Sequence, residues 1–191
     1  MQKFYHNNIS KLKTLQLSIN LVLQKYNARD YDTDRFLLEL LNTAVINYKE
    51  LGNTDRESQT LALKAEFLTA QRGINPITFQ KITIRRNEMT NTIAFKIIQA
   101  IELLIRNDLQ ELEQKILQAK EIVTQIVIAG LQAAIITPIK IKAIKGQKQI
   151  EGIWRSLSAD PNIALGQSRV LLQVSKYDVW VILDEALASL K

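Results

Sequence analysis

Apolar residues recur every three or four positions along most of this chain, which is the period of one face of an α-helix. The pattern predicts helices over residues 9–26, from residue 32 or 33 to 51, over 54–73, and in a segment that starts at Asn75-Pro76. Gly52 and Gly73 follow two of these segments, where glycine suits the left-handed conformation past a helix end. Thr54 and Glu57 have the spacing of a capping box, which predicts Thr54 as the cap of the third helix.

The most regular part of the pattern is a heptad seam, in which spacings of three and four residues alternate. Its members are Leu109, Leu112, Ile116, Ala119, Val123, Ile126, Gly130, Ala133 and Thr137. Such a seam predicts a long helix that packs lengthwise against a helix of the same chain or of a partner. Gly130 and Ala133 would let that helix come close. Pro138 should kink or end the long helix.

The pattern after Pro138 is less regular. A helical stripe continues through Ile139, Ala143, Gln147, Ile150, Trp154 and Leu157, but the alternation over 139–142 also fits a short strand. Residues 158–162 form a turn that can cap a following helix, and about 167–190 are expected to be the last helix. We therefore expect an all-α antiparallel bundle of about five to six helices with a long coiled-coil-like central helix or hairpin. It forms one domain over 1–191, or an N-terminal helical subdomain 1–73 and a long-helix subdomain 74–191.

Composition agrees with a helical fold and argues against catalysis. Apolar residues make up 47% of the chain, enough for a core, whereas six Gly and three Pro are too few for the turns of a sandwich or barrel. There is no Cys and one histidine, His6, which we expect to be a surface residue near a fraying terminus. Asp178, Asp184 and Glu185 then have no His or Cys partner for nucleophilic chemistry. We expect a non-enzyme without catalytic residues, cofactor or metal site.

The string Asp30-Tyr-Asp-Thr-Asp34 has carboxylates at alternate positions, as at the start of a calcium loop. Arg35 stands where that loop needs glycine, and Leu41 stands where it needs a bidentate glutamate. We interpret the acids as residues that favour the N-terminus of the following helix.

Positive charge is concentrated in two stretches of a chain whose formal net charge is +6. The candidate phosphate-binding residues are Lys81, Arg85, Arg86, Lys140, Lys142, Lys145, Lys148 and Arg155. They are either solvated helix faces or an electropositive surface for the phosphates of nucleic acid or lipid. Base stacking needs exposed aromatic residues near basic ones, and Trp154 beside Arg155 is the one candidate, although core packing explains it equally well.

Residues 122–139 carry no charge, and as one helix they would span about 27 Å, close to a bilayer core. The lysines that follow resemble a positive-inside flank. Against a membrane span, polar residues form a stripe opposite the seam: Glu111, Gln118, Glu121, Gln125 and Gln132. That stripe favours a packed helix with one face in water, although a bundle that opens and inserts this helix is an alternative. The N-terminus lacks the apolar core of a signal peptide, so we expect a cytoplasmic protein.

These observations lead to three functional hypotheses. The first is a non-catalytic interaction or assembly subunit, whose seam pairs within the chain or with a protein partner or a second copy. The second is a nucleic-acid-associated subunit that contacts backbone phosphate through the basic stretches. The third is a membrane-active bundle that inserts residues 122–139.

Overall fold

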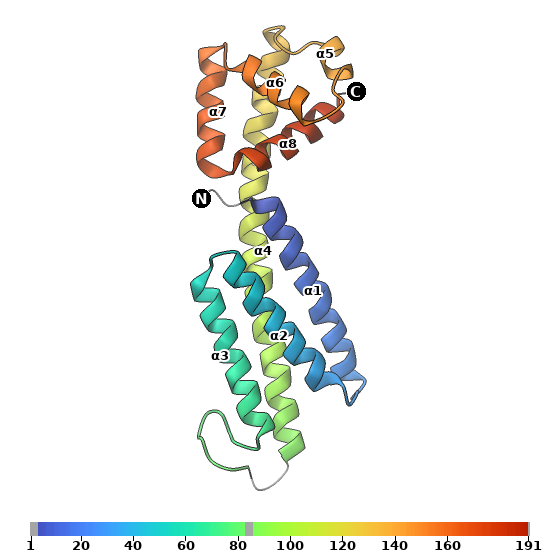
Figure 1. Cartoon of the computed structure of the whole chain (residues 1–191), viewed down its shortest axis with the longest axis vertical. Coiled ribbons are helices and arrows are strands. Elements are labelled where there is room, and N and C mark those ends of the chain that lie inside the picture. Colours follow the sequence, from blue (N-terminus) through green and yellow to red (C-terminus); the bar gives the residue numbers. More distant parts are fainter. Residues whose placement is uncertain (1–3, 83–85, 191) are drawn as a thin grey trace. The chain divides into compact units, whose positions relative to one another are not determined.

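The computed structural model describes residues 4–82 and 86–190, apart from the side chains of Arg86 and Asn87. This part of the chain contains eight helices and no strand, which confirms the all-α class with more helices than expected (Figure 1). The helices are α1 Tyr5–Asn27, α2 Thr33–Glu50, α3 Thr54–Gln71, α4 Arg86–Gln132, α5 Pro138–Lys142, α6 Gln147–Leu157, α7 Pro161–Gln173 and α8 Lys176–Ala188. The expected long helix is α4, with 47 residues.

Contacts divide the chain into two compact units. Unit 1 consists of residues 1–9 and 111–191, and unit 2 consists of residues 10–110. Helices α1 and α4 each contribute residues to both units. The subdomain boundary expected after residue 73 lies inside unit 2.

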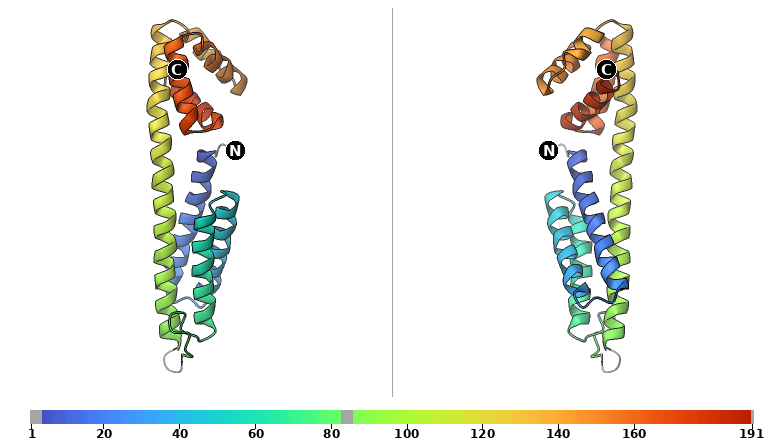
Figure 2. Two further views of the ribbon diagram at one scale, coloured as in Figure 1. Left: turned by 90° about the vertical axis from the view of Figure 1, so that its left-hand side faces the viewer. Right: turned by 90° about the vertical axis from the view of Figure 1, so that its right-hand side faces the viewer.

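Unit 2 is a bundle of α1, α2, α3 and the first part of α4, which alternate in direction (Figures 1 and 2). The three- and four-residue spacing turns one face of each helix inward, and the largest buried side chains include Leu12, Leu15, Ile19, Leu37, Leu41, Tyr48, Phe67, Ile97, Ile98, Ile101 and Ile105. Gly52 and Gly73 have φ of 63° and 76°, which confirms both as left-handed residues after helix ends.

Two expectations about unit 2 are wrong in detail. The cap of α3 is Asn53, whose side chain accepts the Arg56 amide, so Thr54 is the first residue of the helix and the predicted Thr54–Glu57 capping box is wrong. No helix begins at Asn75-Pro76. The Asn75 side chain accepts the amides of Ile77 and Thr78 instead, and this turn-forming contact competes with helix formation.

Unit 1 packs α6, α7 and α8 against the last part of α4, with a core that includes Val123, Ile126, Leu157, Val170 and Leu183. Helix α4 ends at Gln132 and does not continue to Thr137, as the seam pattern had predicted. Ala134 adopts a left-handed conformation with φ of 55°, and the amides of Ile135 and Ile136 both donate to the Gly130 carbonyl. Residues 122–139 are therefore not one helix, and among the described residues no helix is long and apolar enough to cross a bilayer.

The C-terminal region also differs from the expected single helix over 167–190. Asp160 caps α7 and Pro161 is its first residue, as the 158–162 turn predicted. The chain then becomes extended at Val174, and α8 begins after it with a capping box between Ser175 and Asp178. Residues 139–142 are helical, so the strand alternative is wrong.

Candidate functional site

The heptad seam is largely enclosed by helices of its own chain. Four of its residues, Ala119, Val123, Ile126 and Gly130, are buried in unit 1, and Leu109 is buried in unit 2. Leu112 and Ile116 are half-buried, and Ala133 is exposed. A side chain at Gly130 would overlap Leu157 of α6, and one at Gly166 of α7 would meet Ile126. Small residues thus let α6 and α7 approach α4, and a role of the seam in assembly stays a prediction.

The candidate phosphate-binding residues do not all belong to one unit. Lys140, Lys142, Lys145, Lys148 and Arg155 are exposed residues of unit 1, whereas Lys81 is an exposed residue of unit 2. Arg85 lies outside the described residues, as does the side chain of Arg86. Of the two basic stretches, only the second is described in full, and all five of its basic residues are exposed.

We call the exposed residues Ile139, Lys140, Lys142, Lys145 and Lys148 the basic end of unit 1. They lie where the chain leaves α4 and turns through α5 into α6 (Figure 1). The Thr137 side chain caps α5 by accepting the Lys140 amide at 3.4 Å, and Pro138 takes the first helical position, where no amide donor is needed.

Burial of two isoleucines fixes which side chains of this segment face water. Ile141 is 3% exposed and Ile144 is 8% exposed, and both belong to the core of unit 1. In the short helix α5, this orientation leaves Lys140 and Lys142 outside. It also leaves Ile139 81% exposed, so the predicted placement of Ile139 on the buried stripe is wrong.

The segment that forms the basic end contains no acidic residue of its own, although Asp184 and Glu185 line a groove beside Lys145. The sequence has no Asp or Glu between Glu121 and Glu151. The Lys140 ammonium donates to the Ile135 carbonyl at 2.8 Å, near the end of α4, where positive charge is favourable. Within the described part of the chain, no ion pair involves Lys142, Lys145 or Lys148. The segment is thus a compact source of positive potential.

A groove of about 720 Å³ adjoins the basic end and shares Lys145 with it. Its apolar lining includes Phe4, Ile144, Ile150, Tyr177, Trp180 and Val181. Asp184 and Glu185 also line it, and Glu185 pairs with Lys120 at 3.1 Å. These carboxylates make the groove unsuitable for an anion, so an anionic ligand would contact the outward lysines instead.

His6 is not the free surface residue that its position predicted. Its ring Nδ1 lies 2.7 Å from Oδ1 of Asp178, a fully buried carboxylate, and its own backbone amide donates to the same oxygen at 3.0 Å. Asp178 therefore has a histidine partner, which the position of His6 did not predict. Ser175 Oγ donates to Asp178 Oδ2 at 2.6 Å. The carboxylate thus stands between the histidine and the hydroxyl, which is a capping arrangement and does not let His6 activate Ser175 as a nucleophile.

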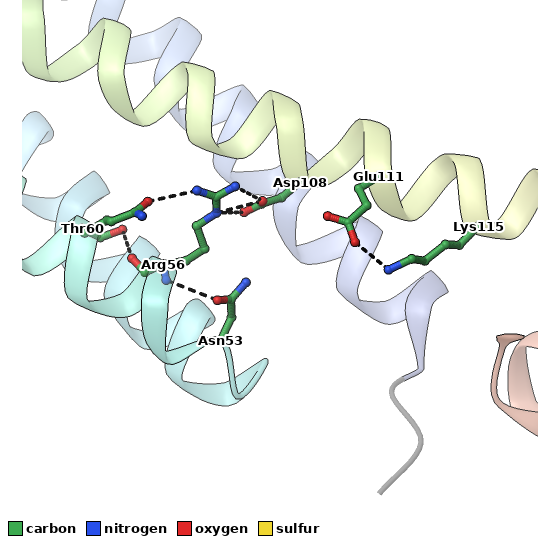
Figure 3. A network of polar contacts seen from close by, with 7 residues as sticks. Asn53, Arg56, Thr60, Asp108, Glu111 and Lys115 are labelled. Atoms are coloured by element: carbon green, nitrogen blue, oxygen red, sulfur yellow. Dashed lines mark hydrogen bonds and ion pairs between the residues drawn. The ribbon is translucent and has the colours of Figure 1, made fainter. Parts of the chain in front are cut away.

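Unit 2 contains a second buried polar cluster, which no local pattern in the sequence indicates. Arg56 Nε and Nη2 donate to Asp108 Oδ1 at 2.9 and 2.8 Å, a short charge-assisted pair between α3 and α4 (Figure 3). The buried Tyr48 hydroxyl makes no hydrogen bond of ordinary geometry among the described residues, although the Asp108 carboxylate lies near enough to interact with it. Burial, together with the negative charge of Asp108, raises the pKa of Tyr48 far above its usual value.

A cleft of about 880 Å³ in unit 2 is lined by residues around the acidic loop. Asp30 accepts from Lys25 at 2.7 Å and from the Asp32 amide, and these contacts lower the pKa of Asp30. Asp34 accepts from Gln71 at 3.1 Å. These carboxylates are therefore engaged in contacts within unit 2.

Trp154 does not form a stacking platform with Arg155. Its side chain is half-buried and packs against the core of unit 1, and its carbonyl accepts the Gln167 side chain at 2.7 Å. Core packing is therefore the better interpretation of this residue.

Comparison with family models, curated proteins and solved structures found no match to this chain in any of the three.

Proposed function

We propose that the protein is a non-catalytic binding protein that attaches to polyanionic, phosphate-bearing partners through the basic end of unit 1. The single observation that carries this function is the group of four exposed lysines within nine residues, in a segment that contains no acid. The other basic stretch gives less support, because Arg85 and the side chain of Arg86, which follow Lys81, lie outside the described residues.

The burial of the seam favours binding through the basic end over assembly through the seam. A partner helix would need the apolar face of α4, but in unit 1 that face already contacts α6, α7 and α8. The exposed lysines need no such rearrangement to meet a partner. Binding through the basic end therefore requires less structural change than binding of a partner helix to α4.

The electrostatics predict weak, sequence-independent binding that depends strongly on salt. Four lysines that neutralise phosphates of duplex DNA would give a slope of log K against log salt of about −3.6. Contact with an anionic membrane would fall off over a similar range, because the attraction decays within about 10 Å at 0.1 M salt.

The test is binding of the whole chain to duplex DNA and to phosphatidylserine vesicles at increasing salt. Replacement of Lys140, Lys142, Lys145 and Lys148 by Gln should abolish binding while circular dichroism and melting temperature stay unchanged. If the folded variant binds as well as the original chain, the basic end is not the binding surface.

A further inference from the structure

We propose that the partner of the basic end is an anionic lipid surface, on which the protein lies peripherally with Ile139 inserted among the headgroups. This inference rests on the proposed function and names the class of partner that the same surface recognises. The choice of a lipid partner depends on Ile139, because an exposed isoleucine among the lysines is not needed to neutralise phosphate.

The surroundings of Ile139 are those of an interfacial contact. Its side chain is 81% exposed, and the neighbouring Pro138 and Ala143 are exposed as well. An apolar side chain at this position gains nothing from water but gains free energy on entering the boundary between headgroups and acyl chains.

The lysines on either side suit the same geometry. Lys140 and Lys142 flank the buried Ile141 and are exposed, as Ile139 is. Long lysine stems can run along an apolar surface while the ammonium groups stay at the level of the phosphates. Attraction to an anionic leaflet and insertion of one apolar side chain then act together, and two such signals are what stable peripheral binding requires.

Nucleic acid fits the basic end less well. Single-stranded nucleic acid is held by aromatic residues that stack on its bases, between basic side chains. No aromatic residue occurs between residues 137 and 149. Of the nearby aromatic residues, Trp154 packs on the core. Tyr177 and Trp180 lie beside Lys176, but they line a groove that also contains Asp184 and Glu185, whose negative charge repels a nucleic acid. An exposed isoleucine gains no favourable contact from a phosphodiester backbone, whereas it does from lipid.

The absence of cysteine allows a direct test of insertion. Ile139→Cys in the whole chain is labelled with a polarity-sensitive fluorophore, and Leu165→Cys is the matched control. Leu165 is 73% exposed on α7 of the same unit and is remote in sequence from the lysines. Vesicles of phosphatidylcholine with phosphatidylserine should shift the emission of the label at 139 to the blue and leave that at 165 unchanged. Neither label should respond to pure phosphatidylcholine or to duplex DNA.

Unlabelled Ile139→Ala provides the second measurement. It should weaken binding to phosphatidylserine vesicles about tenfold, because most of the inserted apolar side chain is lost, and leave binding to heparin unchanged. Vesicle binding without a blue shift at 139 would overturn the insertion and leave the proposed function standing. An equal blue shift of the label at 139 with duplex DNA would overturn the lipid assignment in favour of nucleic acid. Failure to bind vesicles, DNA and heparin would instead overturn the proposed function itself.

Discussion

The carboxylate of Asp178 accepts the backbone amide of His6 at 3.0 Å, although 172 residues separate the two in the chain. It also accepts the Tyr5 amide at 3.1 Å and the Ser175 hydroxyl at 2.6 Å. One buried side chain therefore caps the first turn of α1 and takes part in the capping box of α8. This contact fixes residues 4–9 to the rest of unit 1.

Asp178 should make the stability of unit 1 depend on pH in the acid range. Burial alone would raise the pKa of this carboxyl group, but hydrogen bonds from His6, Ser175 and the Tyr5 and His6 amides outweigh burial and lower it. The folded pKa thus lies below the unfolded value of about 3.9, so the stabilisation is complete above that pH and is lost as pH falls through the folded pKa. Asp178→Asn should flatten this dependence and cost about 2 kcal/mol at neutral pH. Thermal unfolding at a series of pH values measures both effects.

His6→Ala is the control for the same contact. It removes only the ring hydrogen bond and keeps both amide donors, so the expected loss is about 1 kcal/mol. If His6→Ala cost as much as Asp178→Asn, the histidine ring would be the main attachment and the two-helix cap would be wrong.

Gly130 should resist substitution although it lies within a helix. Alanine there gains about 1 kcal/mol in helix propensity, but its methyl group would overlap the buried Leu157, and overpacking costs about 1–3 kcal/mol. We expect a net loss in denaturant unfolding. Gly152 in α6 is the matched control, because a methyl group there meets no atom within 4 Å and Gly152→Ala should be stabilising. Equal effects at both glycines would refute close packing of α6 on α4.

Tyr48→Phe should stabilise unit 2 or leave its stability unchanged. The ring is fully buried, and its hydroxyl makes no hydrogen bond of ordinary geometry among the described residues. Removing a buried unsatisfied hydroxyl avoids a desolvation cost of about 1–3 kcal/mol, while the ring keeps its packing. The midpoint of urea unfolding reports the change. A clear loss of stability would mean that the hydroxyl group has a favourable contact.

The seam makes a separate prediction about folding and assembly. Ile126 is 4% exposed in the core of unit 1, so Ile126→Asp should destabilise that unit by about 4 kcal/mol or more. Half-buried Ile116→Asp should cost less. Thermal melting and light scattering on the two variants separate the outcomes. Unchanged melting temperature and mass in both would show that the seam is not a packing face.

Local pattern was sufficient for most of the helices but not for their ends. The period of the apolar residues predicted α1, α2 and α3 and the left-handed glycines after two of them. The spacing of the seam continues to Thr137, yet Ala134 turns the chain and Thr137 caps the next helix. The apolar pattern over 167–190 is likewise continuous, and the break before Ser175 depends on a capping box that this pattern does not reveal.

The basic end was also predictable only in part, because the exposure of one of its residues depends on tertiary packing. The run of lysines from 140 to 148 is visible in the sequence, and the structure places all four on the surface. The exposure of Ile139 could not be read from it, because that depends on Ile141 and Ile144 turning into the core. The link between His6 and Asp178 joins the two ends of the chain, so no local signal could reveal it.

Binding of two charge-reversal variants to phosphatidylserine vesicles tests the central claim most directly. The first variant changes Lys140, Lys142, Lys145 and Lys148 to Glu. The control changes four exposed basic residues elsewhere, Lys49, Arg72, Arg106 and Arg169, to Glu, and alters the net charge equally. If the basic end is the binding surface, the first variant loses vesicle binding while the control keeps most of it. Equal loss in both variants, or loss in neither, would contradict a binding surface at the basic end.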